Sequence, residues 1–195
     1  MVDLSKYPEF LVKQKVERFE AFTGLESKNR YTITTPDGEP LLYAYETSGG
    51  LSRIFLKKHR PLSIHVVDTN NEPVLTASRR FFWFLSHLHI KDGNGQAIGS
   101  LYRRLSLVNR LLTIEDSARV VLAEIRGPLF RPNTFTVHKA EEIGRITKRW
   151  SGIGKEMFTD ADTFRVEMDT SKVNQEFALL MLGSALAIDL DFFEK

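Results

Sequence analysis

Histidine is the most versatile reactive side chain in this sequence, because neutral imidazoles bind metals and exchange protons near neutral pH. Two of the five histidines, His87 and His89, lie two residues apart and would share one face of a strand. A metal site needs at least a third ligand close to such a pair, and the neighbouring sequence offers none. We therefore interpret the two histidines as a polar strand face.

The other reactive residue types lack the sequence context that catalysis requires. No serine stands in the strand-to-helix elbow that exposes a hydrolase nucleophile. The glycines at 49–50 and 93–95 lie in turns without the lysine or the following helix of a phosphate-binding loop. The chain has no cysteine, which excludes disulfides, thiolate catalysis, cysteine-ligated zinc and palmitoylation. These observations predict a protein that is not an enzyme.

One segment combines cations with large apolar side chains, as membrane-contacting loops do. In residues 79–85, two arginines precede five apolar side chains. Aromatic rings favour the headgroup region of a bilayer, and arginine attracts anionic lipid. The predicted lipid contacts are Arg79, Arg80, Phe81, Phe82, Trp83 and Phe84. The alternative is that these side chains fill a strand or cap one mouth of a barrel.

A second cationic segment lies later in the chain. Arg145, Lys148 and Arg149 occur with Trp150 around the end of a predicted strand, and this basic patch could contact phosphate groups. The formal net charge is only +2, because 27 Lys and Arg face 25 Asp and Glu. Since nucleic-acid-binding domains normally carry a larger basic excess, we expect a phospholipid membrane surface and other proteins as partners, and no nucleic acid. The sequence leaves the oligomeric state open.

Length and composition are those of one globular domain spanning residues 1–195. Apolar residues make up 42% of the chain and charged residues 27%, which is the balance of a packed protein and not of a disordered one. Residues 1–15 contain several charges and no apolar run, so they do not resemble a secretory signal. We therefore expect a cytoplasmic protein that docks peripherally on the cytoplasmic face of a membrane.

Short runs of alternating apolar and polar residues recur along most of the chain. Turn signals separate them, most clearly at 36–38 and 92–95, where proline, aspartate, asparagine and glycine cluster. The predicted strands are 10–15, 31–34, 41–46, 62–67, 74–77, 88–91, 97–102, 111–115, 120–125, 135–138, 143–148 and 163–168. A dozen strands at hairpin spacing favour a closed antiparallel barrel, because closure removes exposed edges.

The period of the hydrophobic pattern changes at residues 174–193, which predict a helix that is apolar nearly all round. The helix positions predicted to be buried are Phe177, Leu180, Met181, Ser184, Ala185 and Ile188. The apolar run 177–188 would span roughly 18 Å, short of the roughly 30 Å of a bilayer core, and Asp189 and Asp191 follow it. We predict a barrel over about residues 10–170 enclosing a helix over about 173–190; the alternative is a membrane-inserting segment.

Segments at both ends of the chain resemble the phospholipid scramblase family. Residues 11–17 and 20–24 are similar to the opening of that domain, 144–153 and 156–164 to its closing signature, and 187–194 to its end, while the middle diverges. The resemblance implies a mainly β fold, a twelve-stranded barrel around a hydrophobic C-terminal helix. This fold is shared with the Tubby C-terminal domain and the LURP-one-related proteins. The resemblance also implies bidirectional, ATP-independent movement of phospholipids across a bilayer, activated by calcium.

The resemblance further implies a calcium loop, and this sequence departs from its pattern. The implied calcium ligands are Asp160 and Asp162, with Glu167 and Asp169 as further oxygen donors. Phe164 and Ser171 occupy loop positions five and twelve, where the pattern has oxygen ligands. A simple turn into the last strand is therefore the alternative to a calcium site.

Two functional hypotheses follow from these features. The family resemblance favours a membrane-associated scramblase that moves phospholipid. The short helix and the absence of the acylated cysteines found in eukaryotic members favour a soluble Tubby-like module that binds lipid or protein without transport. A fold alone does not decide between the two.

Overall fold

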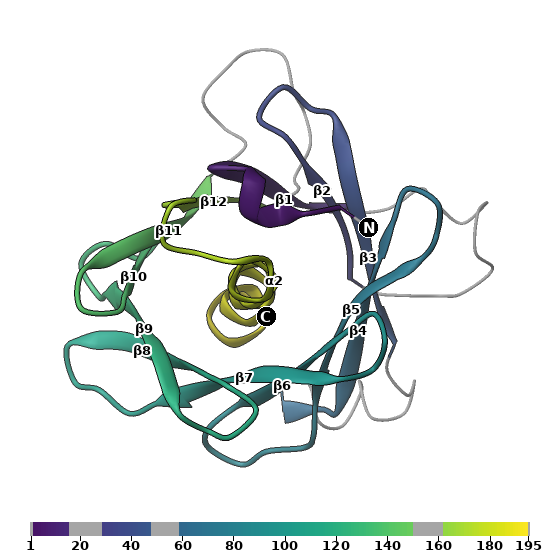
Figure 1. The fold of residues 1–195 in the computed structure, drawn as a ribbon. Coiled ribbons are helices and arrows are strands. Elements are labelled where there is room, and N and C mark those ends of the chain that lie inside the picture. Colours follow the sequence, from purple (N-terminus) through teal and green to yellow (C-terminus); the bar gives the residue numbers. More distant parts are fainter. Residues whose placement is uncertain (1, 16–28, 48–58, 150–161, 195) are drawn as a thin grey trace.

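The computed structural model describes residues 2–15, 29–47, 59–149 and 162–194, which form twelve β-strands around one α-helix (Figure 1). The strands are β1 (Glu9–Lys15), β2 (Arg30–Thr34), β3 (Pro40–Thr47), β4 (Leu62–Asp68), β5 (Pro73–Arg79), β6 (His87–Asp92), β7 (Ala97–Arg104), β8 (Asn109–Glu115), β9 (Val121–Pro128), β10 (Thr134–His138), β11 (Glu142–Arg149) and β12 (Thr163–Met168). Each strand pairs antiparallel with its neighbours in sequence, and β1 also pairs with β12, which closes the barrel. All twelve predicted strands are confirmed, with ends that differ by a few residues at most.

Three hairpin turns use the same local chemistry at the ends of β4, β6 and β8. An aspartate side chain accepts hydrogen bonds from the backbone N–H groups two and four residues further on. The third residue after that aspartate is left-handed in each turn: Asn71 after Asp68, Gly95 after Asp92 and Arg119 after Asp116. Asparagine and glycine adopt this conformation readily, whereas a residue such as arginine pays about 1–2 kcal/mol for it. The backbone of Arg119 is therefore strained, whereas the backbones of Asn71 and Gly95 are not.

Helix α2 (Gln175–Ile188) occupies the interior of the barrel (Figure 1). The side chain of Asn174 caps it by accepting a 2.9 Å hydrogen bond from the N–H of Phe177. Every residue from Phe177 to Leu190 is buried, because strands surround the helix on all sides, and this explains its apolar character. The six predicted buried positions, Phe177, Leu180, Met181, Ser184, Ala185 and Ile188, are confirmed. Within the described residues, no helix has the length and apolarity needed to cross a bilayer.

Buried charges fasten the C-terminal end of the helix, where a π-helical turn, η3 (Asp189–Phe193), follows α2. Arg79 on β5 forms a 3.0 Å ion pair with Asp191. Arg60 lies between Glu46 and Glu194, at 2.8 and 2.7 Å. Buried charges are tolerated when they are paired in this way. The helix end is therefore held to one mouth of the barrel by contacts to strands that are distant in sequence.

Close packing around two glycines, Gly99 in the barrel wall and Gly183 in α2, makes them sensitive to substitution to different degrees. A Cβ at Gly99 would lie 2.3 Å from the backbone oxygen of Glu115, whereas a Cβ at Gly183 would lie 2.9 Å from the terminal carbon of Ile90, which can rotate away. We expect Gly99→Ala to lower the free energy of unfolding by about 1–3 kcal/mol. Gly183→Ala should change it by less than about 1 kcal/mol, because alanine also favours the helix. Urea unfolding of both variants tests this, and equal losses would contradict it.

Candidate functional site

One end of the barrel collects most of the exposed apolar side chains of the described chain. Because consecutive strands alternate in direction, the loops that follow β5, β7 and β9 lie at the same end. Eight of the eleven exposed large apolar side chains belong to these loops. We call them the apolar rim: Phe81, Trp83, Phe84, Leu105, Leu107, Val108, Leu129 and Phe130. Trp83 is 76% exposed and Leu107 is 96% exposed. Most of the surface of these two side chains is therefore available for contact with a partner.

The charge that accompanies the apolar rim is cationic. The three loops 80–86, 105–108 and 129–133 contain no aspartate or glutamate, and an exposed arginine occurs in or beside each: Arg80, Arg104 and Arg131. Arg104 also pairs with Glu115 on β8, at 2.7 Å. Large apolar side chains next to arginines are the composition of a membrane-interface surface. A concentration of exposed apolar side chains at one end of a protein is typical of an interaction site.

An aromatic cluster fills the barrel interior at the same end as the apolar rim. Phe192 and Phe193 of η3 face Phe135 and Phe164 of the barrel wall, with ring centroids 5.6 Å apart for Phe135–Phe192 and 5.7 Å for Phe164–Phe193. The Nζ atom of Lys148 lies 3.9 Å from the centre of the Phe193 ring. The mouth of the barrel that carries the rim is therefore closed by a packed aromatic cluster.

The structure divides the predicted lipid-contact segment between the surface and the core. Arg80, Phe81, Trp83 and Phe84 are exposed, as a lipid contact requires. Phe82 is half-buried: its ring packs 4.9 Å from that of His59 and lies under the Arg79 guanidinium. Arg79 faces the interior because it pairs across the sheet with Leu88, an inward-facing residue. Arg79 therefore stabilises the fold and is not available to lipid.

The predicted basic patch is also split, by the alternation of strand β11. Lys148 points inward and its Nζ lies 2.6 Å from the carboxylate of Asp162. Arg145 and Arg149 point outward, and Arg145 pairs with Glu142 at 2.7 Å. Trp150 lies outside the described residues. The described members of the patch therefore do not form one surface.

The structure does not bring the described calcium candidates together. Asp162, at the start of β12, pairs with Lys148. Glu167 lies five residues further along the strand, about 17 Å away in an extended chain, and pairs with Arg165. Asp169 accepts from the hydroxyl of Ser171 and pairs with Lys172. Within the described residues, no group of three metal-binding side chains occurs. Asp160 lies outside those residues, and calcium binding at this loop stays a prediction.

The apolar rim includes side chains from two loops that were not among the predicted lipid contacts. Residues 105–108 follow two arginines, and residues 129–130 precede a third. Each loop thus repeats, in shorter form, the arginine-and-apolar composition of residues 79–85. That shared composition was the available signal, but only the barrel shows that the loops meet at one end.

Fold and rim together define a class of protein: a barrel that encloses its own C-terminal helix and presents one apolar, cationic end. The chain belongs to the Scramblase family, whose model matches residues 1–195. At the level of the family, this places it among phospholipid scramblase-type proteins.

The curated relatives are similar over nearly the whole chain. The chain is 27% identical to human "Phospholipid scramblase 1" over 98% of its own length and 65% of that protein. It is 26% identical to bovine "Phospholipid scramblase 2", covering 98% of the chain and 70% of that protein. A relative from Saccharomyces cerevisiae, "Altered inheritance rate of mitochondria protein 25", is 24% identical over 96% of the chain and 71% of that protein. The chain thus spans slightly less than two thirds of the human relative. No solved structure matches it.

Proposed function

We propose that this protein docks peripherally on the cytoplasmic face of an anionic membrane through the apolar rim, and that it promotes ATP-independent movement of phospholipid between leaflets. The observation behind the proposal is the gathering of eight exposed apolar side chains and adjacent arginines at one end of the barrel. The names of the relatives, two of them phospholipid scramblases, support the transport part.

The free energy available from the rim is sufficient for reversible docking. Full burial of one large apolar side chain is worth about 1.5–3 kcal/mol, and each arginine near an anionic surface adds about 1 kcal/mol. Partial insertion of Trp83, Phe84, Leu107 and Phe130, the side chains that project most, would therefore exceed the cost of holding the protein at the surface. No acyl chain is needed for this attachment.

The burial of helix α2 favours the rim as the lipid-contacting surface. Helix α2 has no apolar side chain left for lipid, since residues Phe177 to Ile188 are all buried. We propose that rim insertion into one leaflet disturbs lipid packing and lowers the barrier for headgroups to cross, a process that involves no covalent step and no enzyme chemistry. The proposal includes calcium dependence, with Asp160 and Asp162 as ligands of the ion. To bind calcium, the Asp162 carboxylate would have to give up its ion pair with Lys148.

The second candidate function is a Tubby-like module that binds lipid or protein and moves nothing. The enclosed helix favours it, because rearranging α2 would expose a fully apolar surface and break the ion pairs at its end. Membrane binding without transport would be the signature of this function.

Vesicle co-sedimentation tests the rim. We expect Trp83→Ser/Phe84→Ser to weaken binding to vesicles rich in phosphatidylserine by about 10–100-fold, equivalent to about 1.4–2.8 kcal/mol. Val120→Ser/Val121→Ser is the matched control, because these exposed valines lie at the opposite end of the barrel, and it should bind as the original protein does. Equal effects of the two double variants would refute docking through the rim.

A scrambling assay on the same vesicles separates the two functions. Reconstituted protein should accelerate the flip of fluorescent phospholipid, with and without calcium as separate arms, and Trp83→Ser/Phe84→Ser should abolish the acceleration. Rim-dependent binding without any flip, in either arm, would assign the lipid-binding module instead.

A further inference from the structure

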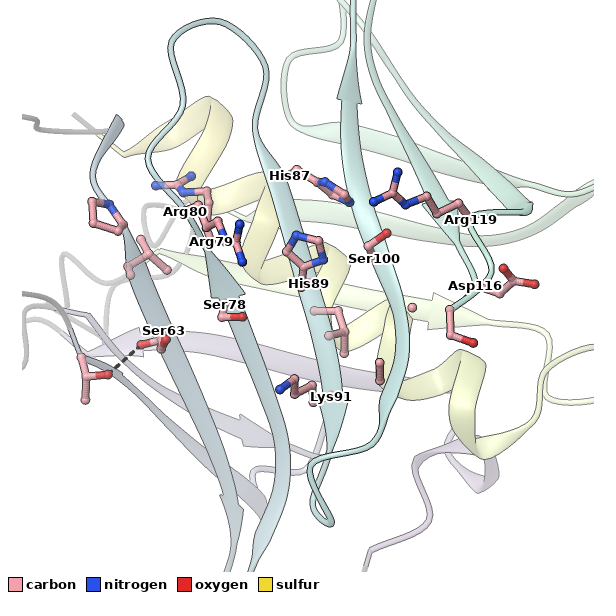
Figure 2. A pocket seen from close by; sticks show the side chains of 17 residues that line it. Ser63, Ser78, Arg79, Arg80, His87, His89, Lys91, Ser100, Asp116 and Arg119 are labelled. Carbon is pink, nitrogen blue, oxygen red and sulfur yellow. Dashed lines mark hydrogen bonds between the residues drawn. The ribbon is translucent and has the colours of Figure 1, made fainter.

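A groove of about 640 Å³ crosses the outer wall of the barrel from the end of β3 to β7, where the β8–β9 turn borders it (Figure 2). Its floor is a row of cross-strand neighbours with short polar side chains: Thr47, Ser63, Ser78, His89 and Ser100. Each residue in this row pairs directly with the next, so their side chains leave the sheet on the same face. Four hydroxyls and one imidazole therefore line one continuous polar floor.

The walls of the groove are cationic. Arg80, Lys91 and Arg119 line it together with His87 and His89 (Figure 2). Within the described residues, none of these three long cations forms an ion pair, in contrast to the paired arginines at the mouth of the barrel. Among the described residues, the three wall cations therefore have no carboxylate partner, and they outnumber Asp116, the one carboxylate in the lining.

Asp116 lines the groove and Glu115 lies beside it, and both carboxylates already accept hydrogen bonds from other groups. Asp116 accepts 2.8 Å hydrogen bonds from the backbone N–H groups of its own turn. Glu115 accepts from the Arg104 guanidinium at 2.7 Å and from the Thr113 hydroxyl at 2.9 Å. Donors therefore outnumber available acceptors in this groove.

Two local features indicate that the groove is built for a ligand. Arg119 holds a left-handed backbone (φ 67°) at a turn position where the related hairpins have Asn71 and Gly95, so the position retains a strained side chain that Figure 2 shows directed toward His87. The Nε2 atom of His87 is buried and has no hydrogen-bond partner among the described residues. Strained backbone and unpartnered buried polar atoms both occur where a ligand completes the structure.

The electrostatics of the two histidines agree with this description. Burial, and then His89, lower the pKa of His87, with Arg119 and Arg104 acting the same way and Glu115 opposing them. Burial, and then Arg80, Arg119 and Lys91, lower the pKa of His89. The three wall cations thus act together on one imidazole, whose ring lies 4.1 Å from that of His87.

We propose that this groove binds a phosphate monoester, with Arg80, Lys91 and Arg119 neutralising its charge and the floor serines and histidines donating to its oxygens. Multiple cationic and hydroxyl donors around one concave site are the arrangement that a phosphate dianion requires. The groove lies beside the apolar rim and shares Arg80 with the 80–86 loop of that rim, but its chemistry does not depend on membrane docking.

The position of the groove points to a lipid headgroup as the source of the phosphate. A second depression of about 470 Å³ shares Arg80, His87, His89 and Arg119 with the groove and continues to Phe81, Phe82 and Leu85. A lipid held with its phosphate in the groove would therefore have its acyl chains beside the apolar rim. This lipid source rests on the proposed docking, whereas a soluble phosphate ester would need the groove alone.

Histidine-detected NMR with glycerol 3-phosphate tests the site in the absence of membrane. Millimolar ligand should shift the ring signals of His87 and His89 and raise the pKa of His89 by about 0.5 unit or more, because an adjacent anion favours the charged imidazole. Glycerol is the matched ligand control and should shift neither ring. Unchanged ring signals with glycerol 3-phosphate would overturn the proposal, whatever the protein does on vesicles.

Arg119→Gly is the decisive variant, because it removes a cation while relieving backbone strain. We expect affinity for glycerol 3-phosphate to fall at least about tenfold, with a Tm equal to or above that of the original protein. Arg145→Gln, on the far strand β11, is the control and should leave the affinity unchanged. Full affinity in Arg119→Gly would also overturn the assignment.

Vesicles then distinguish the two sources of phosphate. At matched surface charge, binding to phosphatidic acid in preference to phosphatidylserine, lost in Arg119→Gly, would support the site with a lipid headgroup as occupant. Equal binding to the two lipids, with the NMR response intact, would support the site with a soluble ester as occupant. Loss of all vesicle binding in Trp83→Ser/Phe84→Ser with an intact NMR response would show that docking and phosphate binding are separate.

Discussion

Arg79→Met is expected to lower the free energy of unfolding by about 3–5 kcal/mol, because it leaves the Asp191 carboxylate buried without its cation. The guanidinium of Arg79 lies 3.0 Å from Asp191, and both side chains are at most 3% exposed. Burial already raises the pKa of Asp191, and Arg79 opposes that rise. Urea unfolding at neutral pH measures the loss.

Two companion variants distinguish a lost ion pair from a lost side chain. Arg80→Met removes the neighbouring exposed arginine and should change stability by less than about 0.5 kcal/mol. Arg79→Met/Asp191→Leu should recover most of the loss, because replacing both partners leaves no unpaired charge. A double variant as unstable as Arg79→Met would mean that packing, and not charge pairing, is what Arg79 supplies.

Asp189→Asn is expected to raise the free energy of unfolding at pH 7.5 by up to about 3 kcal/mol. Asp189 is buried at the end of α2, where the Tyr31 hydroxyl donates a 2.7 Å hydrogen bond to its Oδ2. Burial raises the pKa of Asp189 to about 6, although that hydrogen bond acts in the opposite direction. The folded protein therefore holds an ionised carboxylate at neutral pH at a cost. Asparagine keeps the acceptor oxygen and removes the charge.

The same shift determines how stability depends on pH. Because the pKa in the folded state lies above the ordinary value of 3.8, the folded protein binds this proton more readily than the unfolded chain. The contribution of Asp189 to stability therefore increases as pH falls from about 7 to about 4. Asp189→Asn should lose this component, so its advantage should shrink toward pH 4. Glu72→Gln, an exposed control, should change stability little, and a constant Asp189→Asn advantage at every pH would contradict the assignment.

The architecture could be predicted from the sequence because its signals are local. Period-two alternation and turn residues identified all twelve strands, and the change to helical spacing identified the enclosed helix. A helix that is apolar on every side must be buried, and in a protein made otherwise of paired strands the interior of the barrel is the place that can bury it. The exposed part of the lipid-contact segment, Arg80 to Phe84 apart from Phe82, could also be anticipated from composition.

For neighbouring cationic residues, the sequence did not show which side chain faces the interior and which faces solvent. One step along a strand turns the side chain to the opposite face of the sheet. Arg79 points inward and Arg80 is exposed; Lys148 points inward while Arg149 is exposed. The alternation of Ile146 and Lys148 contained the signal for Lys148. No local pattern predicts the partner of Arg79, since Asp191 lies 112 residues away.

The surfaces with functional potential depend on contacts that no local pattern records. The apolar rim exists because strand direction brings three separate loops to one end, and the phosphate groove exists because register aligns Ser63, Ser78 and His89 across adjacent strands. Buried pairs such as Tyr31 with Asp189 join residues 158 positions apart. The sequence by itself determined the elements and the core, because hydrophobic periodicity acts within each element. Only the tertiary structure decided which charges are buried and which loops meet, because both follow from barrel closure and strand register.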